Sequence, residues 1–337
     1  MTETKPTVRA IEPAHVLPGG RVAIHGDGFD ALRAHAHRVL IGERRAEITR
    51  VSPHTIAAIV PEDALPEIPE VRVELDESSS KPHPVSMAHT LASDLQPVAN
   101  PVFDADKRLY VTLSGTRGEK VPVCIFRIGT DGEVEPYLGD ILNPTGLALG
   151  PDGSLFVSSR EEGTVYRVSA DREISVYADE LGTATGLAFD REGVLHVGDR
   201  RGTIYRIEKN GEPRSFCRLE PSVSAYHLAF DKEGNLFVTA PSLSSVDSVY
   251  RVDAAGEVEV FWKGFGRPQG IAIDENGSVY VAEGLVGDSG VYRLGPDRTP
   301  EQVVASAPIV GIAFDGSGGM VLAGASHVYR VDAGIIG

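Results

Sequence analysis

A unit of about 40 residues recurs from residue 97 to the end of the chain, and this period constrains the fold more than any other feature. Each copy opens on a short apolar stretch of small residues, such as Gly-Leu-Ala-Phe-Asp at 186–190. A turn follows, often Asp-Gly or Asn-Gly, and then an alternating strand. The next strand carries an aromatic-arginine pair, at Phe126-Arg127, Tyr166-Arg167, Tyr205-Arg206, Tyr250-Arg251, Tyr292-Arg293 and Tyr329-Arg330.

Four short strands in each repeat predict a β-propeller, in which every repeat forms one blade. Asn-Gly and Asp-Gly supply the positive φ angles that tight hairpins require. Six copies predict six blades. The last copy leaves only residues 332–337 for its fourth strand. We therefore expect either a short last blade or an outer strand from the segment before residue 97, and we favour the short blade.

The first ninety residues lack the repeat and consist of short strands broken by Gly and Pro. Such runs are typical of a small antiparallel sandwich of the immunoglobulin type. The predicted fold class is all-β, with a sandwich at residues 1–93 and a six-bladed propeller at 94–337. His35 and His37 would form a metal pair if their segment were a strand, and a histidine-rich loop is the alternative.

The N-terminal motifs resemble the IPT/TIG domain family over about residues 7–92. The order of short motifs carries this resemblance: Ile11-Glu-Pro, Pro18-Gly-Gly, Gly26-Asp-Gly-Phe, Val39-Leu-Ile-Gly and Ser52-Pro-His-Thr-Ile. In that family the module is mostly a spacer or interaction domain. The resemblance therefore implies binding or support rather than chemistry.

The charge balance argues against nucleic acid as a partner. Lys and Arg total 32 and Asp and Glu total 48, a formal net charge of −16, so the electrostatic field repels a polyanion. No stretch of 18 apolar residues predicts a membrane span. The first residues lack the apolar core of a signal peptide, which predicts a cytoplasmic location and leaves an exported one open. Cys124 and Cys217 lie in apolar stretches and are expected to be small buried or half-buried side chains, as free cysteines commonly are.

The rim of the propeller is the expected ligand site. Loops that lead into the inner strands and loops that join second to third strands meet at one rim. Four arginines fall there in an acidic chain, Arg160, Arg200, Arg201 and Arg267, and favour a small anionic ligand or an acidic protein loop. The ligand-binding candidates are Asn100, Thr145, Arg160, Thr185, Asp199, Arg200, Tyr226, Arg267 and Gln269.

The repeats also resemble the NHL repeat and the senescence marker protein/gluconolactonase family over about residues 95–337. Members of the latter family bind calcium or zinc at the starts of the inner strands and open lactones with it. The family's glutamate falls here on Ala99, its asparagine on Thr145 or Thr185, and its aspartate on Gln269 or Tyr226. A hard cation needs several oxygen ligands, for which the loop carboxylates of Asp199 and Glu283 are the replacement candidates.

A third resemblance is to the streptogramin lyase group, whose repeats carry His before Gly at the start of a strand and Glu at the end of the second strand. Here His227 occupies the Gly position itself, and Glu283 ends Tyr280-Val-Ala-Glu. His227 is thus a candidate general base with Glu283 as its catalytic partner. The alternative is a polar plug of the channel mouth.

The sequence therefore predicts a non-catalytic binding or scaffold propeller with an accessory TIG-like interaction module and no cofactor. Its expected partner is a protein or a small anionic ligand at the rim. A gluconolactonase-like, metal-dependent lactonase or esterase with Ca²⁺ or Zn²⁺ is the alternative, and a streptogramin-lyase-like enzyme is a further one. Three or more oxygen ligands converging at the channel mouth would favour the enzyme.

Overall fold

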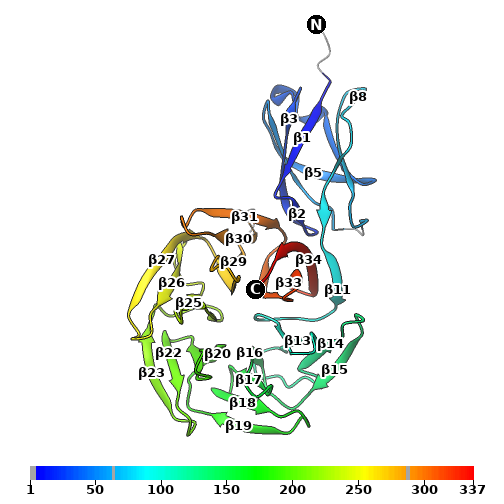
Figure 1. Ribbon diagram of the computed structural model, residues 1–337. Coiled ribbons are helices and arrows are strands. Elements are labelled where there is room, and N and C mark those ends of the chain that lie inside the picture. Colours follow the sequence, from blue (N-terminus) through cyan, green and yellow to red (C-terminus); the bar gives the residue numbers. More distant parts are fainter. Residues whose placement is uncertain (1–4, 63–64, 286–288) are drawn as a thin grey trace. The chain divides into compact units, whose positions relative to one another are not determined.

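The computed structural model describes residues 5–62, 65–285 and 289–337 (Figure 1). Strands dominate these residues, and the helix η1 (Ala31–Ala36) is a short 3-10 turn. The prediction of an all-β fold is confirmed. The described part of the chain contains no helix long and apolar enough to cross a bilayer. Contacts divide the chain into two compact units.

The first unit contains a β-sandwich. Its strands are β1 (Thr7–Glu12), β2 (His15–Val16), β3 (Arg21–Asp27), β4 (His37–Ile41), β5 (Arg44–Val51), β6 (Thr55–Ile59), β7 (Glu70–Leu75), β8 (Ser78–Ser79), β9 (His83–Pro84) and β10 (Ser86–Met87). The order is β1-β3-β6-β5-β4-β7-β8, with β9 also on β7. Strand β5 joins the two layers because Ala46 pairs with β4 and Glu47 with β6.

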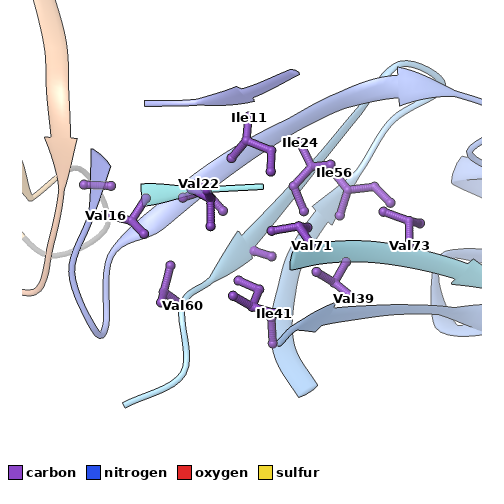
Figure 2. Close-up of a cluster of buried hydrophobic side chains, with 14 of the residues drawn as sticks. Ile11, Val16, Val22, Ile24, Val39, Ile41, Ile56, Val60, Val71 and Val73 are labelled. Atoms are coloured by element: carbon purple, nitrogen blue, oxygen red, sulfur yellow. The ribbon is translucent and has the colours of Figure 1, made fainter. Parts of the chain in front are cut away.

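Alternating apolar residues build the core of the sandwich. In β3 every second residue is buried, including Val22 and Ile24, as the two-residue period of a strand requires. Figure 2 shows Ile24 and Ile56 close to Val71 and Val39, which come from β7 and β4. Packing between the layers, rather than any polar site, therefore defines this unit.

The histidine pair does not form on a strand. His35 lies exposed in η1, whereas His37 begins β4 and is 1% exposed. The Nε2 atom of His37 accepts a hydrogen bond of 3.1 Å from the backbone N–H of Asp30. The metal-pair interpretation fails because the segment is a helical turn and His37 serves the backbone.

The second unit contains four-stranded antiparallel sheets arranged like propeller blades (Figure 1). Four of them each use four consecutive strands: β12 (Val102–Phe103), β13 (Leu109–Thr112), β14 (Ile125–Ile128) and β15 (Val134–Leu138); β16 (Pro144–Leu149), β17 (Leu155–Ser159), β18 (Thr164–Val168) and β19 (Ile174–Ala178); β20 (Ala184–Phe189), β21 (Leu195–Asp199), β22 (Thr203–Ile207) and β23 (Pro213–Arg218); β24 (His227–Phe230), β25 (Leu236–Thr239), β26 (Asp247–Val252) and β27 (Val258–Phe265).

A further sheet begins with β28 (Pro268–Ile273), which pairs with β29 (Val279–Glu283). Strands β30 (Gly290–Leu294) and β31 (Pro300–Ala305) come next in its order. Within the first unit, β2 pairs in parallel with β31 and with β10, so His15 lies opposite Val304.

The last sheet corrects the expectation of a short final blade. It has the order β11-β34-β33-β32, with β11 (His89–Ser93), β32 (Ile309–Phe314), β33 (Gly318–Gly324) and β34 (His327–Ile335). Its outer strand precedes residue 97, as in the alternative that we did not favour. The physical reason is that β34 would otherwise present an unpaired edge, which β11 covers.

Glycines in the inner strands have a steric cause. A Cβ atom on Gly146 would lie 2.1 Å from the carbonyl oxygen of Thr185, and one on Gly186 would lie 2.3 Å from that of Tyr226. At Gly146 and Gly186, neighbouring inner strands therefore approach too closely for a side chain. In the repeat that contains β24, His227 replaces this glycine.

Candidate ligand site at the propeller rim

Three repeats build the rim in the same way. The second strands β17, β21 and β29 end at Ser159, Asp199 and Glu283, each opposite the first residue of its inner strand. The next residue then donates its backbone N–H to the residue that precedes the inner strand. Residues 160, 200 and 284 are therefore equivalent positions on the rim.

Glu283 anchors its own loop. Its side chain accepts hydrogen bonds from the backbone N–H groups of Gly266 (2.8 Å), Arg267 (2.8 Å) and Leu285 (2.7 Å), and the residue is 3% exposed. Burial raises the pKa of Glu283, and the three N–H donors oppose this effect. Both carboxylate oxygens are engaged by backbone.

Asp199 has a similar role two repeats earlier. Its Oδ1 accepts the N–H groups of Thr183 (2.9 Å) and Arg201 (3.2 Å), and the residue is 2% exposed. A hard cation prefers carboxylate oxygens that are free to coordinate it, whereas both oxygens of Glu283 and the Oδ1 atom of Asp199 already accept backbone N–H groups. No group of three or more His, Cys, Asp or Glu residues within 5–62, 65–285 and 289–337 could hold a metal ion.

His227 lies inside the propeller rather than on its surface. It pairs with Thr239 of β25 and is 2% exposed. Burial lowers the pKa of His227 to about 4, with the Gln269 side chain acting in the opposite direction. Its Nε2 atom has no hydrogen-bond partner among the described residues. Its neighbour Tyr226 is 1% exposed and donates its hydroxyl to the carbonyl of Glu220.

His227 and Glu283 are not joined. Within the described part of the chain no hydrogen bond or ion pair connects them, since Glu283 serves its loop and the His227 ring is buried. The candidate base and its candidate partner therefore lack the contact that acid–base catalysis requires.

The remaining neutral candidates connect backbone segments. Asn100 donates to the carbonyl of Ile271 (2.8 Å) and accepts from the N–H of Ile312 (3.0 Å). The hydroxyls of Thr145 and Thr185 each donate to a backbone carbonyl. Gln269 is 7% exposed, and its backbone carbonyl accepts the hydroxyl of Thr239. Asn100 thus joins the inner strands β28 and β32, whereas the Thr145 hydroxyl bonds within its own segment and the Thr185 hydroxyl bonds to β21.

Two arginines at the equivalent rim position differ from these residues because their guanidinium groups are not fully hydrogen-bonded within the described structure. Arg160 is half-buried, and its guanidinium has no hydrogen bond or ion pair among the described residues. Arg200 is also half-buried; its Nη2 donates to the carbonyl of Val223 (2.6 Å), and its Nε is buried without a partner in the described structure. Arg201 and Arg267 are exposed.

The two guanidinium groups influence each other. Burial lowers the pKa of Arg160, and the positive charge of Arg200 lowers it further. Asn143, which we did not identify as a ligand-site candidate, fixes the loop beside them by donating to the carbonyls of Gly115 and Thr116 (3.0 Å each). An asparagine before a strand gives no local signal for this role.

Comparisons with known proteins agree with the two-part architecture. The IPT/TIG domain model matches residues 6–103, which confirms the resemblance of the N-terminal part. No curated protein matches the chain. Among solved structures, an auxiliary nutrient binding protein from Bacteroides ovatus is 13% identical with a TM-score of 0.57, and the match covers 98% of each chain.

Two enzyme-related structures match a smaller part of the chain. A protein named as a candidate gluconolactonase is 18% identical with a TM-score of 0.60, covering 74% of this chain and 93% of that one. Virginiamycin B lyase from Staphylococcus aureus is 14% identical with a TM-score of 0.52, covering 72% and 97%. At these identities the likeness shows the fold alone: a propeller that follows a TIG domain.

Proposed function

We propose that this chain is a non-catalytic binding protein, in which a TIG-like module accompanies a six-bladed propeller of NHL-like repeats that holds a ligand at its rim. In this proposal strands β28–β31 form the fifth blade in chain order, and β32–β34 with β11 form the sixth. The domain boundary lies near residue 93. The proposed ligand site is the rim formed by the loops that lead into the inner strands and the loops that join second to third strands.

The engagement of Glu283 carries the proposal. A lactonase of the gluconolactonase type uses side-chain oxygens to hold its cation, and both oxygens of Glu283 accept backbone N–H groups. Metal binding would break three partly buried hydrogen bonds that hold this loop, at a net cost of about 0.5–1.5 kcal/mol each. The carboxylate is therefore better suited to hold the loop than a metal.

The position of His227 supports the same conclusion. A neutral imidazole with a pKa of about 4 can accept a proton at pH 7. However, a side chain that is 2% exposed does not reach a substrate at the rim, and a general base must lie within hydrogen-bond reach of the proton that it removes. The ring fits the role of a channel plug.

One structural match is consistent with a binding role. The Bacteroides ovatus protein that is named for nutrient binding corresponds to this chain along nearly its whole length. Coverage does not separate the two roles, because a catalytically inactive virginiamycin B lyase is also matched over 98% of this chain. The proposal of a binding role therefore rests on Glu283 and His227.

Calorimetric titration of metal-stripped protein with Ca²⁺ and Zn²⁺ tests the proposal, together with an assay of lactone hydrolysis. We expect no saturable metal heat and no hydrolysis. If metal binding or hydrolysis is detected, Glu283→Gln tests whether Glu283 is responsible. Glu275→Gln is the matched control, because Glu275 is exposed in the turn between β28 and β29, at the end of this hairpin away from Glu283. Micromolar metal binding that Glu283→Gln abolishes and Glu275→Gln retains would overturn the proposal in favour of the lactonase.

A further inference from the structure

We propose that Arg160 and Arg200 together bind the anionic group of a small organic ligand, a carboxylate or a phosphate ester. An apolar portion of the ligand would contact the exposed side chains of Val223, Leu243 and Val246. The inference rests on the proposed binding function and assigns its ligand class.

The repeat places both arginines at one structural position. Arg160 follows β17 and Arg200 follows β21, the second strands of consecutive sheets. Their backbone N–H groups make the same hydrogen bond, to the carbonyls of Asn143 (3.3 Å) and Thr183 (3.2 Å). Consecutive repeats thus place the two arginines at neighbouring rim positions, close enough for the charge of Arg200 to act on Arg160.

Half-burial without a carboxylate partner distinguishes this pair. Arginines such as Arg172 and Arg191 also lack an ion pair among the described residues, but they are exposed, whereas Arg160 and Arg200 are half-buried. Five arginines of the aromatic-arginine motif each pair with an acidic side chain: Arg127, Arg167, Arg206, Arg251 and Arg330. Arg160 and Arg200 have no such ion pair within the described residues.

The buried Nε atom of Arg200 points to a missing acceptor. A buried donor without a partner costs about 1–3 kcal/mol, and two like charges in proximity add to this cost. An anion that bridges the two guanidinium groups offsets the like-charge repulsion and supplies acceptors for the N–H groups that face the rim. Guanidinium geometry suits the planar carboxylate and the phosphate equally, since both accept paired N–H donors.

Exposed apolar residues next to Arg200 favour an organic anion over an inorganic one. Arg200 donates to the carbonyl of Val223, whose own N–H donates to the carbonyl of Pro241 (2.9 Å). The adjoining loop exposes Leu243 (95%) and Val246 (43%), and Val223 is 38% exposed. These side chains offer apolar surface within the same loop cluster as the cationic pair.

The test uses hexanoate, inorganic phosphate and the neutral hexanamide as probes, titrated calorimetrically at constant ionic strength. We expect hexanoate to bind more tightly than phosphate and hexanamide to give no saturable heat. Arg160→Gln and Arg200→Gln should each weaken hexanoate binding about tenfold or more, as the loss of a charge-assisted hydrogen bond does. Arg191→Gln removes the same charge from an exposed residue at the opposite end of the β20–β21 hairpin, and should change the affinity less than about twofold.

Several outcomes would overturn the inference. They are hexanoate binding that survives both substitutions, equal binding of hexanamide, and no binding of either anion. Phosphate binding as tight as hexanoate binding would remove the apolar part of the proposal. Saturable binding of hexanamide with an affinity that neither arginine substitution changes would contradict this inference. It would leave the proposed binding function in place. Arg160→Lys and Arg200→Lys keep the charge and serve as second variants if a glutamine variant does not fold; unchanged hexanoate affinity in both would also contradict the paired geometry.

Discussion

The hydroxyl of Ser158 donates a hydrogen bond of 2.5 Å to the carbonyl oxygen of Thr185, which links β17 to the inner strand of the next sheet. The same hydroxyl accepts the N–H of Gly146 at 2.8 Å. Ser158 is 0% exposed, so water cannot replace either bond. One side chain thus fixes the spacing between two inner strands beside the rim.

We expect Ser158→Ala to lower the free energy of unfolding by about 1–3 kcal/mol, because it leaves a buried donor and a buried acceptor unsatisfied. Urea denaturation followed by the fluorescence of Trp262, the single tryptophan, measures this loss. Ser175→Ala, at an exposed serine of β19, is the control and should change stability by less than about 0.5 kcal/mol. Equal stability of Ser158→Ala and wild type would contradict the role of this bond.

Gly186→Ala should destabilise the propeller by about 2 kcal/mol or more, as overpacking in a closely packed interior does. The new Cβ would lie 2.3 Å from the backbone oxygen of Tyr226. A side chain could relieve such a contact by changing its rotamer, but a backbone carbonyl in a paired strand cannot. Gly295→Ala is the control because its Cβ would meet only Asp297 Oδ1 at 3.7 Å. A melting temperature for Gly186→Ala as high as that of the control would show that the strands can separate.

The buried His227 predicts a loss of stability in acid. The unfolded chain protonates this ring below about pH 6.5, whereas the pKa of about 4 keeps it neutral in the folded chain. Lowering the pH from 7 to 4.5 therefore favours the unfolded chain, by about 2–3 kcal/mol from this group.

Urea denaturation of wild type and His227→Gln at both pH values measures this contribution. The variant should lose less stability between pH 7 and 4.5 than wild type does. Part of the slope remains in the variant because burial also lowers the pKa of His196. An identical pH dependence in the two proteins would mean that His227 does not contribute.

The unpaired arginines predict an unusual response to salt. Arg160→Gln removes one of two like charges, so we expect a small gain in stability, about 0.5 kcal/mol at low ionic strength. Salt screens the repulsion in wild type, and the gain should shrink at about 0.5 M sodium chloride. Melting curves at the two salt concentrations test this, and a loss of stability at low salt would indicate an attractive partner for Arg160.

Much of the fold was predictable because its signals are local. The aromatic-arginine period and the Asp-Gly turns lie within windows of a few residues, and each predicts its hairpin without reference to the rest of the chain. The inner-strand glycines marked a close approach of backbone. The TIG motifs likewise follow one another in order, and the family model matches them at residues 6–103.

The candidate site was predictable only as a set of positions. Register placed Asp199, Glu283 and Arg200 on the rim, but their side-chain chemistry depends on neighbours that are distant in sequence. The loop carboxylates accept backbone N–H groups, which a sequence pattern does not distinguish from metal ligands. The proximity of Arg160 and Arg200, 40 positions apart, follows from the packing of consecutive sheets.

The sequence by itself determined the strands, their turns and the order of the two parts, because hydrophobic period and turn chemistry act over short distances. Only the tertiary structure decided that β11 pairs with β34, that His227 is enclosed and that two arginines stand without carboxylates. Those features depend on which strand edges and charges meet when the propeller closes, and closure brings together segments more than 200 residues apart.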